Sequence, residues 1–172
     1  MDPADDRFLE ACGSDGPLRL ELRGLRGPGV QRPTFSRPFV VVGRAPGVDL
    51  ALDHPAVSRR HAYLQLIGGQ IFAVDLASRT GTCWPHGAQP MGWLPPGGHL
   101  RIGPYRIGRP DPDPGAVADV APTSRLYPMP GAPAATLEFL DPTVEPATWP
   151  VEHALVLIGR SPACKLQLSG PG

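Results

Sequence analysis

Hydrophobic residues recur at every second position in short stretches, and glycine, proline and polar residues separate these stretches. This alternation, typical of strands with one buried face, occurs at 18–22 and 48–52, and a valine-rich run typical of a buried strand lies at 39–42. Four further short stretches continue the series, at 62–67, 71–76, 99–102 and 105–107. Gly68 and Gly69 separate two of them and predict a two-residue hairpin turn, because glycine readily adopts positive φ. The pattern predicts an all-β fold, an antiparallel β-sandwich.

The composition supports this fold class. The 172 residues include 21 glycines and 24 prolines, about a quarter of the chain, which argues against a helical bundle. The chain has no run of about 20 apolar residues, as a membrane-spanning helix would need, and its acidic start does not match a secretory signal. These features predict a soluble, cytoplasmic protein.

Charge and cysteine content narrow the possible functions. Sixteen basic residues balance sixteen acidic ones, so no overall field attracts nucleic acid or an anionic membrane. The three cysteines, at 12, 83 and 164, form no CxxC pair, and the histidines lack metal-ligand spacing. We therefore expect no disulfide framework, no metal and no cofactor, and any anion site must be local.

Proline marks a boundary in the chain. Seven prolines fall between residues 110 and 133, where little apolar periodicity remains. This composition predicts an extended linker at 110–134, following a domain at 17–109, and residues 1–16 are expected to be a flexible acidic N-terminus.

An internal repeat follows the linker. The residues Val42-Gly43-Arg44 recur as Ile158-Gly159-Arg160, 116 positions later, and Leu20-Glu21-Leu22 recurs as Leu137-Glu138-Phe139. A period of domain size indicates a tandem duplication. Because the second copy ends before most of the first has a counterpart, residues 135–172 are expected to be a truncated start of a second domain. Such a fragment should expose an apolar face and be loosely ordered.

Three short motifs carry the candidate chemistry. They are Gly43-Arg44, the Ser-Arg-Arg-His sequence at 58–61, and a loop at 75–82 that contains Arg79, Thr80 and Gly81. All three fall at strand ends or in loops, which can meet at one edge of a sandwich. The guanidinium of Arg44 matches phosphate oxygens, Ser58 can donate a hydroxyl, and Arg59 or Arg79 can add charge. Gly43 and Gly81 would let the backbone turn sharply, and Asp75 is interpreted as a strand end.

This ordered set resembles the forkhead-associated (FHA) domain, in which Gly-Arg, Ser-x-x-His and a Ser-x-[Asn or Thr]-Gly-Thr loop follow one another. The resemblance covers residues 18–109, and residues 136–169 resemble the first third of a second such domain. It implies a module without catalytic activity that binds phosphothreonine-containing proteins in Ser/Thr kinase signalling. No nucleic-acid, membrane or small-molecule partner is expected.

The resemblance also implies roles for individual residues. Arg44 and Ser58 would bind the phosphate, and Arg59 would line the same pocket. Arg79 and Thr80 would contact the peptide around the phosphothreonine. Gly43, His61 and Gly81 would support the site, with His61 bracing the Ser58 loop and not acting as a ligand or base.

The chain departs from the family pattern at two places. Thr80 stands where many members have Asn, and its side chain lacks the amide that clamps a peptide backbone at two points. Residues 84–87 read Trp-Pro-His-Gly where a short Val-Asn-Gly turn is common. Peptide affinity and sequence preference therefore do not follow from the family.

Alternative interpretations remain at this point. A phosphate-independent interaction scaffold on the same fold is the main one, because fold does not fix function. A hydrolase using Ser58 and His61 lacks the G-x-S-x-G elbow. Nucleic-acid binding lacks aromatic stacking partners near the arginines.

Other residues have structural interpretations. Trp84 and Trp93 are expected to be packing aromatics within a connection rich in proline and glycine. Arg101, Arg106 and Arg109 are expected to alternate outward from the closing strands.

Overall fold

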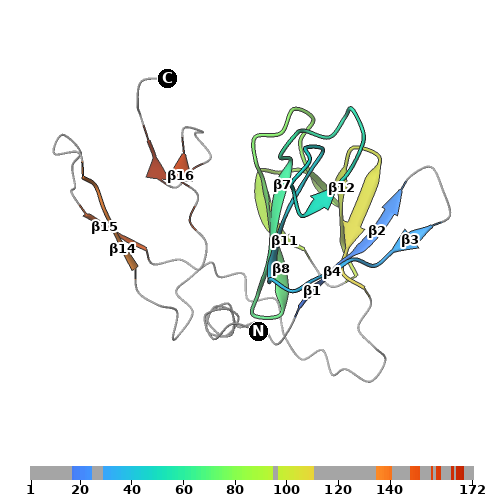
Figure 1. Cartoon of the computed structure of the whole chain (residues 1–172), viewed down its shortest axis with the longest axis horizontal. Coiled ribbons are helices and arrows are strands. Elements are labelled where there is room, and N and C mark those ends of the chain that lie inside the picture. Colours follow the sequence, from blue (N-terminus) through green and yellow to red (C-terminus); the bar gives the residue numbers. More distant parts are fainter. Residues whose placement is uncertain are drawn as a thin grey trace. The chain divides into compact units, whose positions relative to one another are not determined.

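The computed structural model describes residues 17–24, 29–94, 97–110, 135–140, 148–151, 156, 158–159, 164 and 166–168. The chain divides into two units, Met1–Pro122 and Thr123–Gly172, which we describe separately. All regular elements of the described residues are β-strands (Figure 1), and no helix there is long and apolar enough to cross a membrane. The predicted N-terminal segment, Cys12, nearly all of the predicted linker and Arg160 lie outside the described residues.

Two β-sheets make up the first unit. The five-stranded sheet has the order β11(Met91–Leu94), β8(Gln70–Asp75), β7(Ala62–Ile67), β5(Phe39–Gly43), β6(Leu50–Ala51). The six-stranded sheet has the order β10(Gly87–Ala88), β9(Cys83–Trp84), β12(His99–Ile102), β13(Tyr105–Gly108), β2(Glu21–Gly24), β3(Val30–Gln31). A separate ribbon pairs β1(Leu18–Arg19) with β4(Thr34–Phe35). Strand pairing in this unit is antiparallel except between β5 and β6, which run parallel.

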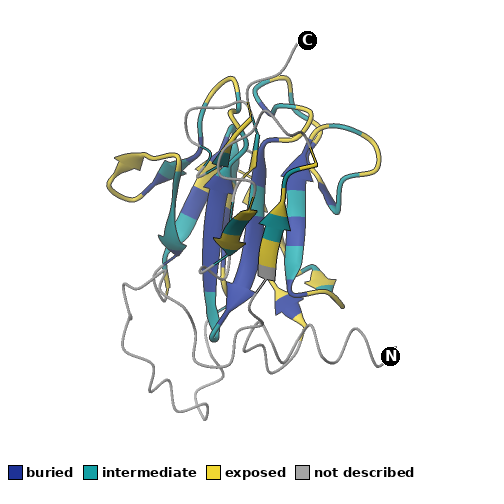
Figure 2. Cartoon of the chain, turned by 90° about the vertical axis from the view of Figure 1, so that its left-hand side faces the viewer, coloured by how far each residue is buried: buried dark blue, intermediate teal, exposed yellow. Residues whose placement is uncertain are grey.

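The hydrophobic core lies between the two sheets. Val40 and Val42 on β5 and Leu64 on β7 are fully buried, and they belong to one cluster with Leu100 on β12 and Ile107 on β13. Burying a side chain of this size contributes about 1.5–3 kcal/mol to folding. Buried residues follow the strands, whereas the loops at the ends of the sandwich are largely exposed or half-buried (Figure 2).

The predicted sandwich is confirmed, and five predicted strands, at 39–42, 62–67, 71–76, 99–102 and 105–107, match β5, β7, β8, β12 and β13 to within one residue at each end. Gly68 and Gly69 have φ values of 54° and 74°, and Ile67 pairs with Gln70, so the two-residue hairpin turn is also confirmed.

Two predicted strands differ from the structure. The stretch at 18–22 divides into β1 and β2 at Leu20, whose amide donates to Pro33 O (3.1 Å) outside the regular ladder. Of the stretch at 48–52, only Leu50–Ala51 pairs as a strand. Val48 and Asp49 lie in the loop that brings the chain back alongside β5, and Leu52 follows the strand.

The interpretation of the region around Trp84 and Trp93 as a connection was wrong. Strands β9, β10 and β11 occupy it, and prolines and glycines between them interrupt the alternation that would have revealed them. The expected packing role of the two tryptophans is confirmed. Trp84 is 7% exposed and lies in the core cluster, and Trp93 contacts Phe72 edge to face, with ring centroids 5.0 Å apart.

The second unit contains two short strand pairs. β14(Ala135–Glu138) runs antiparallel to β15(Thr148–Val151), and β16(Ile158–Gly159) runs parallel to β17(Leu166–Gln167). The pairs Ile158–Leu166 and Gly159–Gln167 lie 116 positions after the pairs Val42–Leu50 and Gly43–Ala51 of the first unit.

A backbone hydrogen bond repeats with the same offset. Leu168 N donates to Gly159 O (2.9 Å), as Leu52 N donates to Gly43 O (2.8 Å). Leu140, Ile158 and Leu168 are at least 44% exposed, so the described part of this unit presents apolar side chains to solvent.

Candidate functional site

The strand register brings the three motifs to one end of the five-stranded sheet. Val42 pairs with Ala62, and Ala62 pairs with Asp75, so the end of β5, the start of β7 and the end of β8 lie side by side. The loops at 44–49, 52–61 and 76–82 therefore meet at this end, opposite the hairpin turn between β7 and β8 (Figure 1).

Gly43 is required here because two backbone segments approach closely. Arg44 N donates to Ser58 O (2.9 Å), and Ala45 N donates to Arg59 O (3.0 Å). A Cβ atom at Gly43 would lie 2.2 Å from Arg59 O, a distance that no side chain can occupy. Gly43 therefore supports the site through close approach, not through the sharp turn predicted from the sequence. Gly81 does have positive φ, 74°, as predicted.

The buried side chain of His61 connects the loop that contains Ser58 with the loop at 76–82. Its side chain is fully buried, its Nδ1 accepts the Ser58 backbone N–H (3.1 Å), and its Nε2 lies 3.1 Å from Gly81 O. Since Nδ1 accepts, this pattern assigns the proton to Nε2, which donates to Gly81 O. Both ring nitrogens are thus used in holding the Ser58 loop to the 76–82 loop, as the bracing prediction requires.

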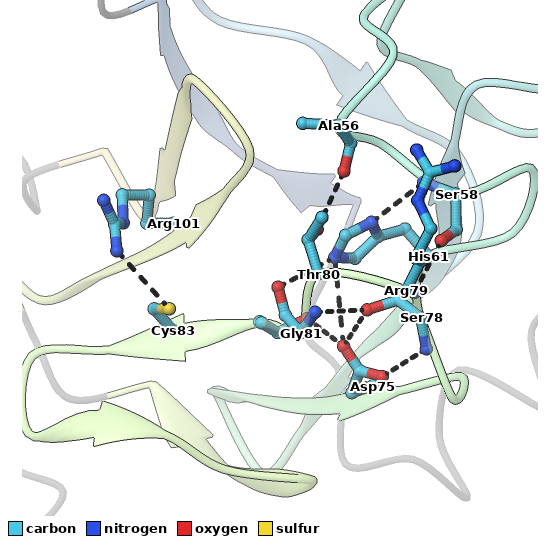
Figure 3. Close-up of polar contacts among 11 residues, drawn as sticks. Ala56, Ser58, His61, Asp75, Ser78, Arg79, Thr80, Gly81, Cys83 and Arg101 are labelled. Carbon is cyan, nitrogen blue, oxygen red and sulfur yellow. Dashed lines mark hydrogen bonds and ion pairs between the residues drawn. The ribbon is translucent and has the colours of Figure 1, made fainter.

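Asp75 not only ends a strand, as the sequence predicts, but also organises the loop that follows. It is the last residue of β8, and its carboxylate accepts bonds from Ser78 N (2.7 Å), Ser78 Oγ (2.6 Å) and Thr82 Oγ1 (2.7 Å). Ser78 Oγ in turn accepts the Gly81 N–H (3.0 Å) (Figure 3). This network folds the 76–82 loop back on itself. Asp and Ser side chains commonly hydrogen-bond to nearby backbone groups in loops, and this is the sequence signal that could have predicted the network.

Ser58 presents its hydroxyl at the junction of the loops. Ser58 Oγ accepts the Arg79 backbone N–H (2.9 Å) (Figure 3), so the hydroxyl proton stays available to a ligand. The Arg79 guanidinium donates to Pro55 O, and Thr80 Oγ1 donates to Ala56 O (2.8 Å). The polar groups of Arg79 and Thr80 thus also fasten the loop that precedes Ser58.

The basic side chains at this end are exposed and lack acidic partners. Arg44, Arg59 and Arg79 are exposed, and none forms an ion pair with a carboxylate of the described residues. Arg44 Nε makes one long bond, to Val57 O (3.3 Å), which leaves its terminal nitrogens for another acceptor. The arrangement combines exposed guanidinium donors with one hydroxyl, which is suited to a multiply charged oxyanion such as a phosphate ester.

Part of the chain is similar to one known protein family. The model of the FHA domain matches residues 40–103, a range that includes all three motifs. Over 83 residues the chain is 36% identical to the glycogen accumulation regulator GarA of Mycolicibacterium smegmatis, covering 48% of this chain and 52% of GarA. It is also 36% identical over 86 residues to the oxoglutarate dehydrogenase inhibitor of Corynebacterium glutamicum, covering 48% and 58% of the two chains. The chain thus spans about half the length of these curated relatives.

Part of the chain is also similar to solved structures. One, from a study of phosphothreonine-dependent FHA domain interactions, is 25% identical and has a TM-score of 0.48, covering 56% of this chain and all of the other. Mycobacterium tuberculosis EmbR in complex with a low affinity phosphopeptide is 21% identical, with a TM-score of 0.48, and the match covers 65% of this chain and 30% of EmbR.

Proposed function

We propose that this chain contains an FHA domain and that its first unit binds phosphothreonine-containing segments of other proteins in Ser/Thr kinase signalling. Arg44 and Ser58 are the proposed phosphate ligands, and Arg59 adds charge at the rim. Arg79 and Thr80 contact the peptide beside the phosphothreonine. The relatives are named as a regulator and an inhibitor, which supports a regulatory part for this protein.

One observation carries the proposal. Three exposed arginines, with no carboxylate partner among the described residues, converge with the Ser58 hydroxyl at one end of the five-stranded sheet, in a chain whose net charge is zero. Uncompensated guanidinium groups of this kind are stabilised by a dianionic phosphate, which offers three acceptor oxygens.

A hydrolytic use of Ser58 and His61 is disfavoured by the same geometry. A general base must lie within hydrogen-bond reach of the nucleophile's proton. His61 Nδ1 instead accepts the Ser58 backbone N–H, and Nε2 faces Gly81 O. Neither nitrogen is left for the Ser58 hydroxyl, so we propose a binding module and not an enzyme.

The second unit is proposed to repeat the start of the first. The parallel pair β16–β17 and the bond from Leu168 N to Gly159 O reproduce β5–β6 and its neighbouring bond at the same offset of 116. The strand pairing and its adjoining backbone bond, both repeated at one offset, support a tandem arrangement of FHA-type units, with the linker of 110–134 between them.

Discrimination between phosphorylated residues tests the proposed function. Phosphothreonine peptides are expected to bind at least about fourfold more tightly than matched phosphoserine peptides, since a buried methyl contributes about 0.8 kcal/mol. Peptides with Asp or Glu in place of the phosphoresidue should not bind measurably, because a carboxylate has less charge and fewer acceptors. Isothermal titration with a phosphothreonine peptide library checks this. Equal binding of phosphorylated and unphosphorylated peptides would instead favour a phosphate-independent scaffold.

Ser58→Ala is expected to weaken phosphopeptide binding by at least about tenfold, because a hydrogen bond to a charged group contributes about 1.5–3 kcal/mol. Ser36→Ala, which removes an exposed hydroxyl elsewhere in the first unit, is the matched control and should bind like the wild type. Fluorescence anisotropy with one labelled phosphopeptide measures both. Unchanged affinity of Ser58→Ala would remove Ser58 from the proposed ligands.

A further inference from the structure

A row of arginines crosses the outer face of the six-stranded sheet. The register places Arg101 on β12 opposite Arg106 on β13, and Arg106 opposite Arg23 on β2. All three are exposed, whereas the alternate residues Leu100, Ile102 and Ile107 point into the core. The expectation that Arg101 and Arg106 alternate outward is thereby confirmed. We call these three residues, Arg23, Arg101 and Arg106, the arginine row.

The arginine row costs stability. Directly opposed side chains in an antiparallel pair have Cβ atoms about 4.5–5.5 Å apart, and like charges at this distance destabilise the sheet. Within the arginine row, Arg23 alone has an acidic partner among the described residues, Glu21, at 2.5 Å. Arg101 contacts the Cys83 thiol at 3.6 Å, which brings no negative charge, and Arg106 has no polar partner within the part of the chain that the structure describes.

The same face already stabilises one carboxylate. Glu21 accepts bonds from Arg23 and from Arg32 of the same unit (2.6 and 3.3 Å). The hydrogen bond from Arg23, followed by weaker contributions from Arg32, lowers the pKa of Glu21. With Glu21 engaged at one end, Arg101 and Arg106 form the part of the row that lacks negative charge.

We infer that the arginine row is a second anion-binding surface, and that its partner is an acidic segment of another protein with Asp or Glu at alternate positions. In an extended segment, side chains at alternate positions lie about 6.6–6.8 Å apart on one side. Guanidinium groups on long, exposed stems adjust to that spacing across neighbouring strands. The surface requires no phosphate and lies on a different sheet from the Arg44 site.

A nucleic acid fits this surface less well. Single-stranded nucleic acid is held by a basic groove together with aromatic side chains on which bases stack. The register neighbours of the arginine row are Cys83 on β9 and Val30 on β3, and neither offers a stacking surface. Three adjacent charges also give a short footprint for a phosphate backbone.

Binding of an unphosphorylated twelve-residue peptide of alternating Glu and Gly tests the inference. With the full chain at low salt, we expect saturable binding in fluorescence anisotropy that weakens as salt rises. Arg101→Glu/Arg106→Glu should bind roughly tenfold more weakly, because two attractions become repulsions. Arg19→Glu, which changes another exposed arginine, on β1, and Arg44→Ala should both bind like the wild type.

Several outcomes would overturn the inference. They are unchanged binding by the double variant, an equal loss in Arg19→Glu, or tighter binding of a single-stranded oligonucleotide than of the peptide at the same row. Loss in Arg44→Ala would assign the peptide to the phosphate site instead. Thermal melting accompanies each variant, and Arg106→Thr, which removes the central charge and suits a strand, should melt no lower than the wild type and still bind more weakly.

Discussion

Arg44→Ala is expected to reduce phosphothreonine-peptide affinity at least a hundredfold. The variant removes an exposed guanidinium at the loop junction, which has no carboxylate partner among the residues that the structure describes. Bidentate contacts between arginine and phosphate are among the stronger hydrogen bonds, roughly twice as strong as neutral ones, and no other group replaces the fork. Titration calorimetry with a phosphothreonine peptide measures the loss.

Arg44→Lys separates charge from geometry. Lysine keeps the positive charge but lacks the planar fork. The phosphopeptide affinity of Arg44→Lys should therefore lie between those of Arg44→Ala and the wild type. The melting temperature of both variants should stay close to the wild-type value, since Arg44 makes only a long bond to Val57 O. If Arg44→Ala binds the phosphopeptide with unchanged affinity while remaining folded, the phosphate site lies elsewhere.

His61→Ala is expected to lower stability by about 2–4 kcal/mol, in the range of buried side chains whose loss leaves a cavity and unpaired polar groups. His61 is fully buried, and its removal orphans the Ser58 N–H and Gly81 O. For a domain of this size, each kcal/mol corresponds to about 4–8 °C in melting temperature. Thermal denaturation should therefore show a decrease of about 10 °C or more.

His86→Ala is the matched control, because His86 is exposed in the turn between β9 and β10 and should change the melting temperature little. Well below its melting temperature, His61→Ala should still bind phosphopeptide, though with a less ordered Ser58 loop. An unchanged melting temperature together with lost binding, or with lost hydrolysis of a phosphopeptide, would make His61 a direct functional group.

Strands with clean alternation were predictable, and interrupted ones were not. The stretch at 62–67 matches β7 because neither glycine nor proline breaks it, and the paired glycines after it fix the turn. The strands around Trp84 and Trp93 were missed because Pro85, Gly87 and Pro90 mimic a loop. Pairing with neighbouring strands supplies the stability that local preference there lacks.

The sequence by itself determined the fold class, the order of the three motifs and the repeat at offset 116. These features depend on residue type and spacing, which the chain displays directly. Tertiary structure decided how the motifs work together. It decided that Gly43 is required by the approach of Arg59 O, that Asp75 organises the 76–82 loop, and that the arginine row lies on one face. Each of these depends on which strands pair and in what register, and a single sequence does not display pairing between segments far apart along the chain.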